Sequence, residues 1–189
     1  MHYSGQIIRT DFDYKVESKL RPLGEDNGYE HLWNVGSADV EASALVTWLH
    51  DSSYYSLVSS AVEHSKVIFA RTGANDPDFN MRSEPALIMR QSGKNHVFAS
   101  VLETHGYFNE STEASLNARG EVKSVNVMGH DDIGTVIRIE TVKCNDYYFA
   151  ISNEAEAKHA ETRTVKFDSH YYTWTGAFAQ VEPTGEEPA

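Results

Sequence analysis

The sequence has a single cysteine, few prolines and no long apolar run. Cys144 has no partner for an intramolecular disulfide, and one cysteine cannot build a cysteine-rich zinc module. No apolar run approaches the roughly 20 residues that a membrane-spanning helix requires, and no basic-then-apolar leader follows Met1. Because Cys144 lies in a stretch with strand character, we expect its thiol to be buried and inert.

Positive charge is also scarce. There are 16 Lys and Arg residues against 28 Asp and Glu residues, which gives a formal net charge of -12. A nucleic-acid coat or a protein that binds anionic membranes needs a basic surface. We therefore expect no nucleic-acid and no membrane partner, and any anionic ligand must be met by a local cluster of basic side chains.

The pattern of apolar residues predicts an all-β protein. Short apolar runs alternate with turn residues, and long helical patterns between strands are missing. This is typical of an antiparallel β-sandwich, and an apolar share of 40% can build its core. We predict one domain over residues 1–181, followed by a flexible tail at 182–189. Strands are expected at residues 44–50, 54–60, 66–71, 86–90, 96–103, 121–128, 134–143, 146–152, 162–168 and 170–178.

Two connections invite specific predictions. The sequence Ser92-Gly93-Lys94-Asn95 separates the apolar runs 86–90 and 96–103, and its Gly and Asn favour a tight turn. We therefore expect these two runs to pair as a β-hairpin. Residues 110–117 are polar, and either a short helix or a long loop fits them.

No common sequence signature for nucleotide binding, for a serine hydrolase or for a zinc protease occurs. The looser candidate is GYEHLWN, in which Tyr29 and His31 are two residues apart. If this piece is extended, both side chains lie on one face, and a Tyr beside a His can transfer protons at a sugar. The alternative is a partly buried aromatic cluster with Trp33.

A second candidate is the polar loop from Arg71 to Arg82. The two arginines frame Asn75, Asp76 and Asn80. A guanidinium suits a bidentate grip on a planar carboxylate, so the loop could bind an acidic ligand. The alternative is a turn whose side chains cap their own backbone.

Nine histidines are scattered through the chain at no metal-ligand spacing. Each one is therefore more typical of a surface or a satisfied core histidine than of a ligand. His50 and His105, which fall on expected strands, are the two that merit attention.

Four segments in order carry a resemblance to a known family: HYSGQIIRTDFDY, LGEDNGYEHLWN, FARTGANDPDFNMRSEPALIMR and HVFASVLETHGYFNES. Together they resemble the C-terminal β-sandwich portion of the heparinase II/III-like polysaccharide lyases. These segments are most similar in sequence to the oligoalginate lyases of polysaccharide lyase family 17. The resemblance covers roughly residues 2–153.

The resemblance implies an active site in a cleft between this β portion and an N-terminal (α/α) toroid. The implied reaction is β-elimination at a uronic acid, and the toroid would supply an Asn-His pair and the principal Tyr. This chain has none of those toroid positions. Tyr29 resembles the tyrosine that the β portion presents to the cleft, and His31, Arg71 and Arg82 are expected near the substrate.

The resemblance also implies a structural zinc held by histidines and an aspartate. Asp13 and His50 are the nearest matches, with His2 as a weak third, and an upstream histidine would fall before residue 1. Because strand-like sequence begins at once after Met1, we expect the chain to be a portion of a longer enzyme. A periplasmic or secreted parent enzyme fits this family.

Two hypotheses follow. In the first, the chain is the β-sandwich part of an alginate or oligoalginate lyase, which works on an acidic polysaccharide with a toroid domain in cis or in trans and has little activity alone. In the second, it is a non-catalytic module. It would then bind an acidic glycan through Arg71, Arg82, Tyr29 and Trp33, or pack as a structural domain against a toroid partner.

Overall fold

A computed structural model describes residues 1, 3–73, 84–154 and 160–187 of the chain. The described residues form fifteen strands and one short 3-10 turn, η1 (Tyr29–His31). The first strands are β1 (Gln6–Thr10), β2 (Lys15–Pro22), β3 (Leu32–Val40), β4 (Ser43–His50), β5 (Ser53–Ser60), β6 (Ser65–Thr72) and β7 (Glu84–Arg90). They are followed by β8 (Ser100–Asn109), β9 (Ala114–Leu116), β10 (Val122–His130), β11 (Gly134–Thr141), β12 (Asp146–Ser152), β13 (Thr162–Phe167), β14 (His170–Thr175) and β15 (Phe178–Val181). No helix in these described parts is long and apolar enough to cross a membrane.

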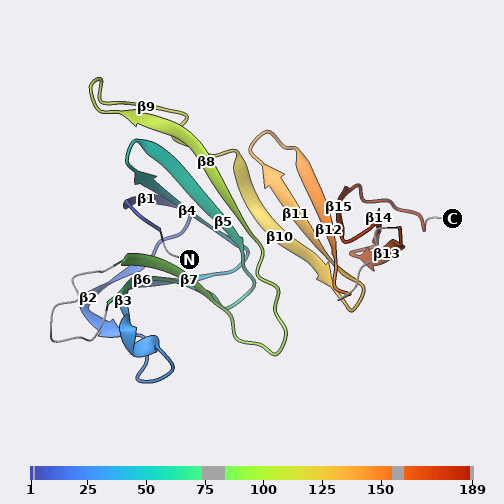
Figure 1. Cartoon of the computed structure of the whole chain (residues 1–189), viewed down its shortest axis with the longest axis horizontal. Coiled ribbons are helices and arrows are strands. Elements are labelled where there is room, and N and C mark those ends of the chain that lie inside the picture. Colours follow the sequence, from blue (N-terminus) through green and yellow to red (C-terminus); the bar gives the residue numbers. More distant parts are fainter. Residues whose placement is uncertain (2, 74–83, 155–159, 188–189) are drawn as a thin grey trace.

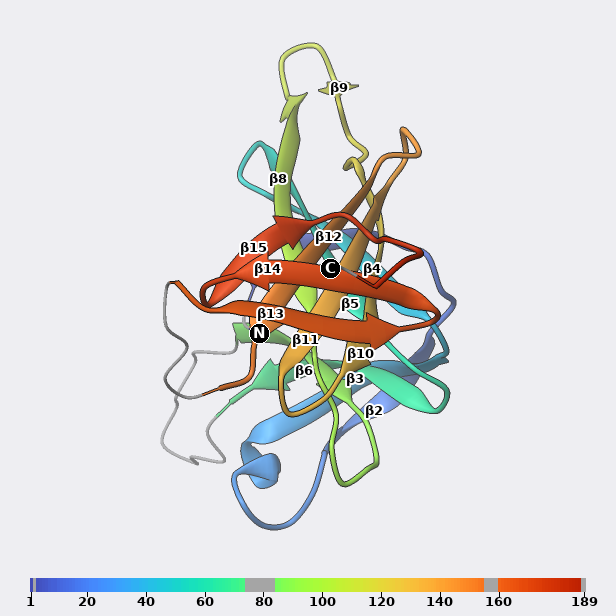
Figure 2. The same ribbon diagram turned by 90° about the vertical axis from the view of Figure 1, so that its right-hand side faces the viewer.

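The strands form four antiparallel sheets that stack as layers (Figure 1). The central sheet has the order β1-β4-β5-β8-β9, and the lower sheet has the order β2-β3-β6-β7. The C-terminal sheet has the order β10-β11-β12-β15, and the hairpin β13-β14 forms the last layer. Figure 2 shows this hairpin crossing the strands of the C-terminal sheet. The predicted all-β antiparallel sandwich is confirmed, with more layers than a simple two-sheet sandwich has.

The central sheet is packed on both of its faces. Toward the lower sheet, Trp48 and Leu57 pack with Phe69 in one apolar cluster. Toward the C-terminal sheet, Val58 packs with Val125 in a second cluster. Successive side chains of a strand point to opposite faces, so a doubly covered strand must be apolar almost continuously. This explains the unbroken buried runs in β4 and β5.

The second face of the central sheet also carries a buried polar chain. The Thr47 and Ser56 hydroxyl oxygens are 2.8 Å apart, and the Ser56 oxygen lies 2.8 Å from His105 Nε2. His105 Nδ1 lies 2.8 Å from the Asn117 carbonyl oxygen, which only accepts. Nδ1 therefore donates and Nε2 accepts. His105 is a satisfied structural histidine, in agreement with the simpler of the two interpretations of the histidines.

The hairpin predicted across residues 92–95 is wrong. β7 pairs with β6 in the lower sheet, whereas β8 pairs with β5 in the central sheet. Residues 91–99 cross from one sheet to the other, and Ala99 exchanges hydrogen bonds with Ser60 at the end of β5. The reason is packing, because Leu87 belongs to the core below the central sheet and Val101 to the core above it. The burial of the two runs in different cores therefore prevails over the local preference of residues 92–95 for a tight turn.

The structure also bears on three smaller expectations. Cys144 is exposed in the turn between β11 and β12, where its φ is 58°, so the expectation of a buried thiol is wrong. Residues 110–117 form neither a full helix nor a featureless loop, because β9 pairs with β8. In the segment predicted as a flexible tail, Thr184 exchanges two backbone hydrogen bonds with Tyr171.

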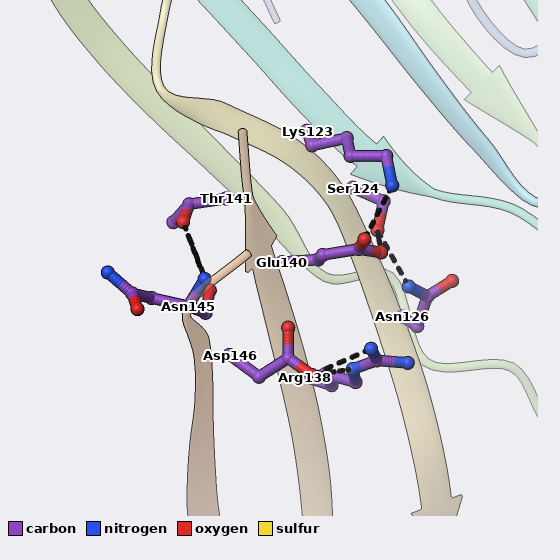
Figure 3. Close-up of polar contacts among 8 residues, drawn as sticks. All are labelled: Lys123, Ser124, Asn126, Arg138, Glu140, Thr141, Asn145 and Asp146. Carbon is purple, nitrogen blue, oxygen red and sulfur yellow. Dashed lines mark hydrogen bonds and ion pairs between the residues drawn. The ribbon is translucent and has the colours of Figure 1, made fainter. Parts of the chain in front are cut away.

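On the face turned away from the central sheet, the C-terminal sheet is covered over only part of its area. Val136 and Ala150 pack beneath Tyr172 and Trp174 of the hairpin. Farther along the same strands, charged and polar side chains replace the apolar ones (Figure 3). Arg138 donates to Asp146 Oδ2 from Nε at 3.0 Å and from Nη2 at 2.7 Å.

Glu140 occupies the neighbouring position of this polar network (Figure 3). It accepts hydrogen bonds from Lys123 Nζ at 2.5 Å and from the Ser124 hydroxyl at 3.2 Å. Asn126 Nδ2 donates to the Ser124 oxygen at 3.1 Å. The hydrogen bond from Lys123 lowers the pKa of Glu140 and raises the pKa of Lys123. Cross-strand polar pairs therefore hold the part of the sheet that no apolar layer covers.

We predict that Gly129→Ala destabilises the packing of the hairpin on the C-terminal sheet. A Cβ at Gly129 would lie 2.2 Å from Cγ of Phe167, so the ring must move out of its place. Overpacking of this kind costs about 1–3 kcal/mol. Urea unfolding should show that loss. Gly185→Ala is the matched control, since a Cβ there meets nothing within 4 Å. Equal midpoints for the two variants would contradict the prediction.

We also predict that Lys123 sets the titration of Glu140. Because the pKa of this carboxyl group is lowered in the folded chain, its pairing stabilises the fold above the usual carboxyl pKa. That contribution is lost as the pH falls through the lowered value. In a carboxyl-carbon NMR titration, Lys123→Met should raise the pKa of Glu140 toward its usual range. Lys143→Met, which removes the partner of Glu121, should leave it unchanged.

Candidate functional site

The amino-terminal segment joins two sheets at one end of the sandwich. The Met1 amino group donates to the Leu87 carbonyl oxygen at 2.9 Å, and the Tyr3 N–H donates to the Pro85 carbonyl oxygen at 3.1 Å. Met1 and Tyr3 thus lie beside β7 of the lower sheet. A few residues later, β1 pairs with β4 of the central sheet. The segment therefore crosses the open end between the two layers.

A cavity of about 530 Å³, here called the Arg71 cleft, lies under this crossing segment. Its polar side chains are Tyr3, Ser4, Gln6, Tyr14 and Arg71, and its apolar lining includes Phe69. Within the described residues, neither a carboxylate nor an imidazole lines it. The cleft therefore offers a cation and hydrogen-bond donors to a ligand, in a protein that is otherwise acidic.

The two tyrosines of the cleft are fixed by aromatic neighbours. The Tyr3 ring lies 5.5 Å from the Trp48 ring, and the Tyr14 ring lies 4.6 Å from the Phe69 ring, measured between centroids. Burial is the main cause that raises the pKa of Tyr3, and Tyr14 adds to it, whereas Arg71 acts in the opposite direction. Tyr3 therefore stays protonated at neutral pH and can donate a hydrogen bond.

Arg71 lies between two hollows. It belongs to β6, where it is paired with Trp33 of β3, and it is exposed. Besides the Arg71 cleft, it lines a second hollow of about 340 Å³ with Leu20 and Trp33. None of the carboxylates that the structure describes forms an ion pair with its guanidinium. The Arg71 side chain thus carries a positive charge that a planar anion could engage.

Tyr29 and His31 lie in a turn and not in extended backbone, which corrects the expectation that both point to one face. Gly28 has a φ of 85°, and the Tyr29 and His31 N–H groups donate to the carbonyl oxygens of Asp26 and Gly28. Glycine tolerates this left-handed backbone at no steric cost, so the chain turns here before β3 begins. Tyr29 is 40% exposed.

The contacts of the two side chains differ. The Arg90 guanidinium carbon lies 5.4 Å from the centroid of the Tyr29 ring, which is a cation–π distance. His31 Nε2 lies 3.6 Å from Glu30 Oε1. The Gly73 N–H donates to the His31 carbonyl oxygen at 3.1 Å, so the turn adjoins the end of β6 just past Arg71.

The structure therefore brings Tyr29, His31 and Arg71 to the same end of the lower sheet, although Tyr29 and His31 do not line the Arg71 cleft. The predicted binding residue Arg82 lies outside the described residues, as do the other polar residues of its loop: Asn75, Asp76 and Asn80. Their predicted roles stay predictions.

The described residues do not supply a complete zinc site. Asp13 is exposed in the connection between β1 and β2, and His50 Nε2 lies 3.6 Å from Asp51 Oδ2. Within the described parts of the chain, no three His, Cys, Asp or Glu side chains lie together as metal ligands. His2 lies outside those parts. The zinc at Asp13 and His50 stays a prediction that needs ligands from elsewhere.

Sequence reasoning missed Tyr3 and Tyr14. Both occur in the strand-like sequence that follows Met1, but neither has a local motif that marks it as a binding residue. Their place in the cleft depends on the crossing of the amino-terminal segment and on a pairing with distant strands. The only available signal was the abundance of aromatics in HYSGQIIRTDFDY.

The arrangement in the cleft can bind an anionic, hydroxylated ligand. A guanidinium can hold a carboxylate, and two phenols can donate hydrogen bonds to a hydroxyl or ether oxygen. Proton abstraction requires a base, and the described lining of the cleft has no imidazole or carboxylate for this role. The described lining of the cleft is therefore suited to binding a ligand.

Comparison with known proteins shows which proteins this chain is similar to. No family model matches the chain. The chain is 32% identical over 186 residues to a protein named alginate lyase from Stenotrophomonas maltophilia, an alignment that covers 96% of this chain and 24% of that protein. It is 40% identical over 133 residues to an exo-oligoalginate lyase from Saccharophagus degradans, with 66% and 18% covered.

The chain thus spans about a quarter or less of the length of these relatives. The aligned stretch includes nearly all of the layers described above, so the likeness is not limited to one motif. Over most of its length, the chain is related to alginate lyases.

Proposed function

We propose that the chain is the β-sandwich portion of a heparinase II/III-like polysaccharide lyase that cleaves alginate or oligoalginate. The observation that carries the proposal is the 32% identity over 96% of the chain to a protein named alginate lyase. The Arg71 cleft supports it, because an acidic chain that handles an acidic polysaccharide must gather positive charge locally. Arg71 does so where no described carboxylate neutralises it.

The proposed reaction is β-elimination. A base removes the proton from C5 of a uronate unit, the electron pair forms the C4–C5 double bond, and the C4–oxygen bond breaks. An acid then protonates the departing glycosidic oxygen. As the C5 proton leaves, negative charge builds up on the carboxylate attached to C5. A cation that binds this carboxylate therefore stabilises the transition state.

In this scheme, Arg71 binds the carboxylate, and Tyr3 and Tyr14 donate hydrogen bonds within the cleft. Tyr29 is the proton-transferring residue that this portion presents to the substrate, and His31 and Arg82 lie close to it. The exposure of Tyr29 and the nearby Arg90 guanidinium support that role for Tyr29.

The proposal requires a second structural unit. The Arg71 cleft has no described base, and the toroid of the proposed family would supply the Asn-His pair and the principal Tyr. The toroid would act in cis or in trans on the same polysaccharide, and zinc would hold part of the β portion. A second candidate is a module that binds acidic glycans without cleaving them, and it agrees with a cleft whose described lining has no imidazole or carboxylate.

Arg71→Gln should weaken the binding of alginate oligomers by about tenfold or more, since a hydrogen bond to a charged group contributes roughly 1.5–3 kcal/mol. Isothermal titration calorimetry on this chain measures the effect. Lys166→Gln is the matched control, because it removes the same charge from the hairpin, where Lys166 contacts Tyr171. An unchanged affinity in Arg71→Gln would remove Arg71 from the site.

We also predict that the isolated chain does not turn over oligoalginate at a rate typical of lyases, because it lacks the expected base. Ultraviolet absorbance of the unsaturated product checks this. Binding without product would agree with both candidate functions. Rapid turnover by the chain alone, abolished by Tyr29→Phe, would show instead that this portion is a complete catalyst.

A further inference from the structure

A second polar cavity, of about 410 Å³, lies far from the Arg71 cleft. It is formed where the end of β5, the β7–β8 connection and β10 meet, and we call it the histidine cavity. Its lining includes Val62, which hydrogen-bonds Ser65 at the start of β6. Arg71 is at the other end of that strand. A strand rises about 3.3 Å per residue, so the ends of β6 are roughly 23 Å apart.

The polar lining of the histidine cavity consists of two imidazoles, two amides and one hydroxyl: His96, His130, Asn95, Asn126 and Ser60. Its remaining lining is small and apolar and includes Val97 and Val127. No Asp, Glu, Lys or Arg lines it among the described residues. This volume falls within the range of small-molecule sites, which are about 300–1,000 Å³.

His96 is a half-buried histidine with one unsatisfied ring nitrogen. Its Nε2 atom is buried and has no hydrogen-bond partner among the described residues, and its ring meets the Phe98 ring edge-on with 4.5 Å between centroids. A buried polar atom without a partner is rare in native proteins and calls for an explanation. A ligand that supplies the partner provides one.

His130 is held in a defined orientation. Asn153 Nδ2 donates to the Asp131 carbonyl oxygen at 2.6 Å, which fixes the amide, and it also lies 3.0 Å from His130 Nδ1. An amide nitrogen only donates, so the Asn153 contact is a hydrogen bond in the tautomer whose proton resides on Nε2. Thr135 Oγ1 lies 2.8 Å from the same Nδ1 and donates its own proton to Asn153 Oδ1 at 3.0 Å, so the Thr135 contact is a hydrogen bond in the other tautomer. In both cases Nδ1 faces protein groups, whereas His130 Nε2 has no described partner.

The remaining polar groups offer both donors and acceptors. Asn126 Nδ2 donates a hydrogen bond to the Ser124 hydroxyl oxygen, at the edge of the network in Figure 3, and Asn126 Oδ1 has no described partner. Ser60 accepts a hydrogen bond from the Ala99 N–H and keeps its own hydroxyl proton free to donate. Mixed donors and acceptors above small apolar side chains suit a sugar ring, which presents hydroxyls at its rim and C–H groups on its faces.

Three charged residues adjoin the cavity lining in the sequence and bear on the choice between a neutral and an acidic sugar. Lys94 precedes Asn95, Glu63 follows Val62 and Asp131 follows His130 in the sequence. Asp131 Oδ1 is engaged by the N–H groups of the turn that follows, at 2.8 and 2.9 Å. Two imidazoles and no described lining carboxylate make this cavity suitable for an anion in an otherwise acidic chain.

We propose that the histidine cavity binds one acidic sugar unit, a uronate, as a second glycan site separate from the Arg71 cleft. The choice of uronate rests on the proposed function, whereas the site itself rests on the two histidines. His130 Nε2–H and His96 hold the carboxylate, and Asn126, Asn95 and Ser60 engage the hydroxyls. Together the two sites would hold one long acidic chain at points roughly 20 Å or more apart, or two short chains.

The test is an NMR titration of the histidine ring protons with a mannuronate trisaccharide. In the chain with its natural sequence and in Arg71→Gln, we expect saturable shifts at both His96 and His130. His130→Gln, observed at His96, should weaken binding about tenfold or more, because a hydrogen bond to a charged group is lost. His130 is exposed, so this variant leaves the cores intact.

Two controls separate a site from general contact. β-Mannotriose, which has the same ring size but no carboxylate, should cause much smaller shifts. His170→Gln, on the distant hairpin, should leave the affinity unchanged, since its ring contacts only the Asp168 carbonyl oxygen among the described residues. His96→Gln, observed at His130, should weaken binding as His130→Gln does.

The outcomes distinguish this inference from the proposed function. Shifts at His96 and His130 that are absent, that equal those with mannotriose or that survive both histidine substitutions overturn the second site. If such a result accompanies Arg71-dependent binding in calorimetry, the proposed function stands alone. If the histidine shifts occur while Arg71→Gln has no calorimetric effect, the second site stands and the role of the Arg71 cleft fails.

Discussion

The burial of the central sheet on both faces is the constraint on which the other layers depend. Trp48 and Leu57 require a cover on one side, and Val58 requires another on the other side. The lower and C-terminal sheets supply these covers, and the C-terminal sheet in turn needs the β13-β14 hairpin over Val136 and Ala150. Burying apolar surface contributes about 25 cal/mol per Å², so removing any cover would expose the core of its neighbour to water.

The extent to which the sequence predicts this fold differs between local and long-range features. Strands such as β12, at Asp146–Ser152, follow from β-branched and aromatic residues between turn signals, and they lie where the pattern places them. The partner of each strand does not follow. Residues 92–95 have the composition of a tight turn, yet Leu87 and Val101 pack in different cores. Only the full set of layers decides whether neighbouring strands pair.

The candidate site shows the same division. Arg71 could be selected from the sequence, because an arginine beside polar loop residues is a recognisable anion-binding feature. Tyr3 and Tyr14 could not, since the crossing of the amino-terminal segment brings them to Arg71. The histidine cavity was equally hidden, because His96 and His130 meet through the contact of the β7–β8 connection with β10. Residues from separate strands form a site only when the register is known.

The first residues of the chain also have a protective role. A strand at the edge of a sheet presents unpaired backbone groups that can recruit other chains. In the lower sheet, Met1 and Tyr3 occupy these groups on β7, where Leu87 and Met1 bond in both directions and Pro85 accepts from Tyr3. Tyr3, one of these two residues, also lines the Arg71 cleft. Displacing Met1 and Tyr3 would therefore open the Arg71 cleft and expose the unpaired backbone groups of β7 to other chains. Loss of ligand binding and aggregation through intermolecular β-pairing would then occur together.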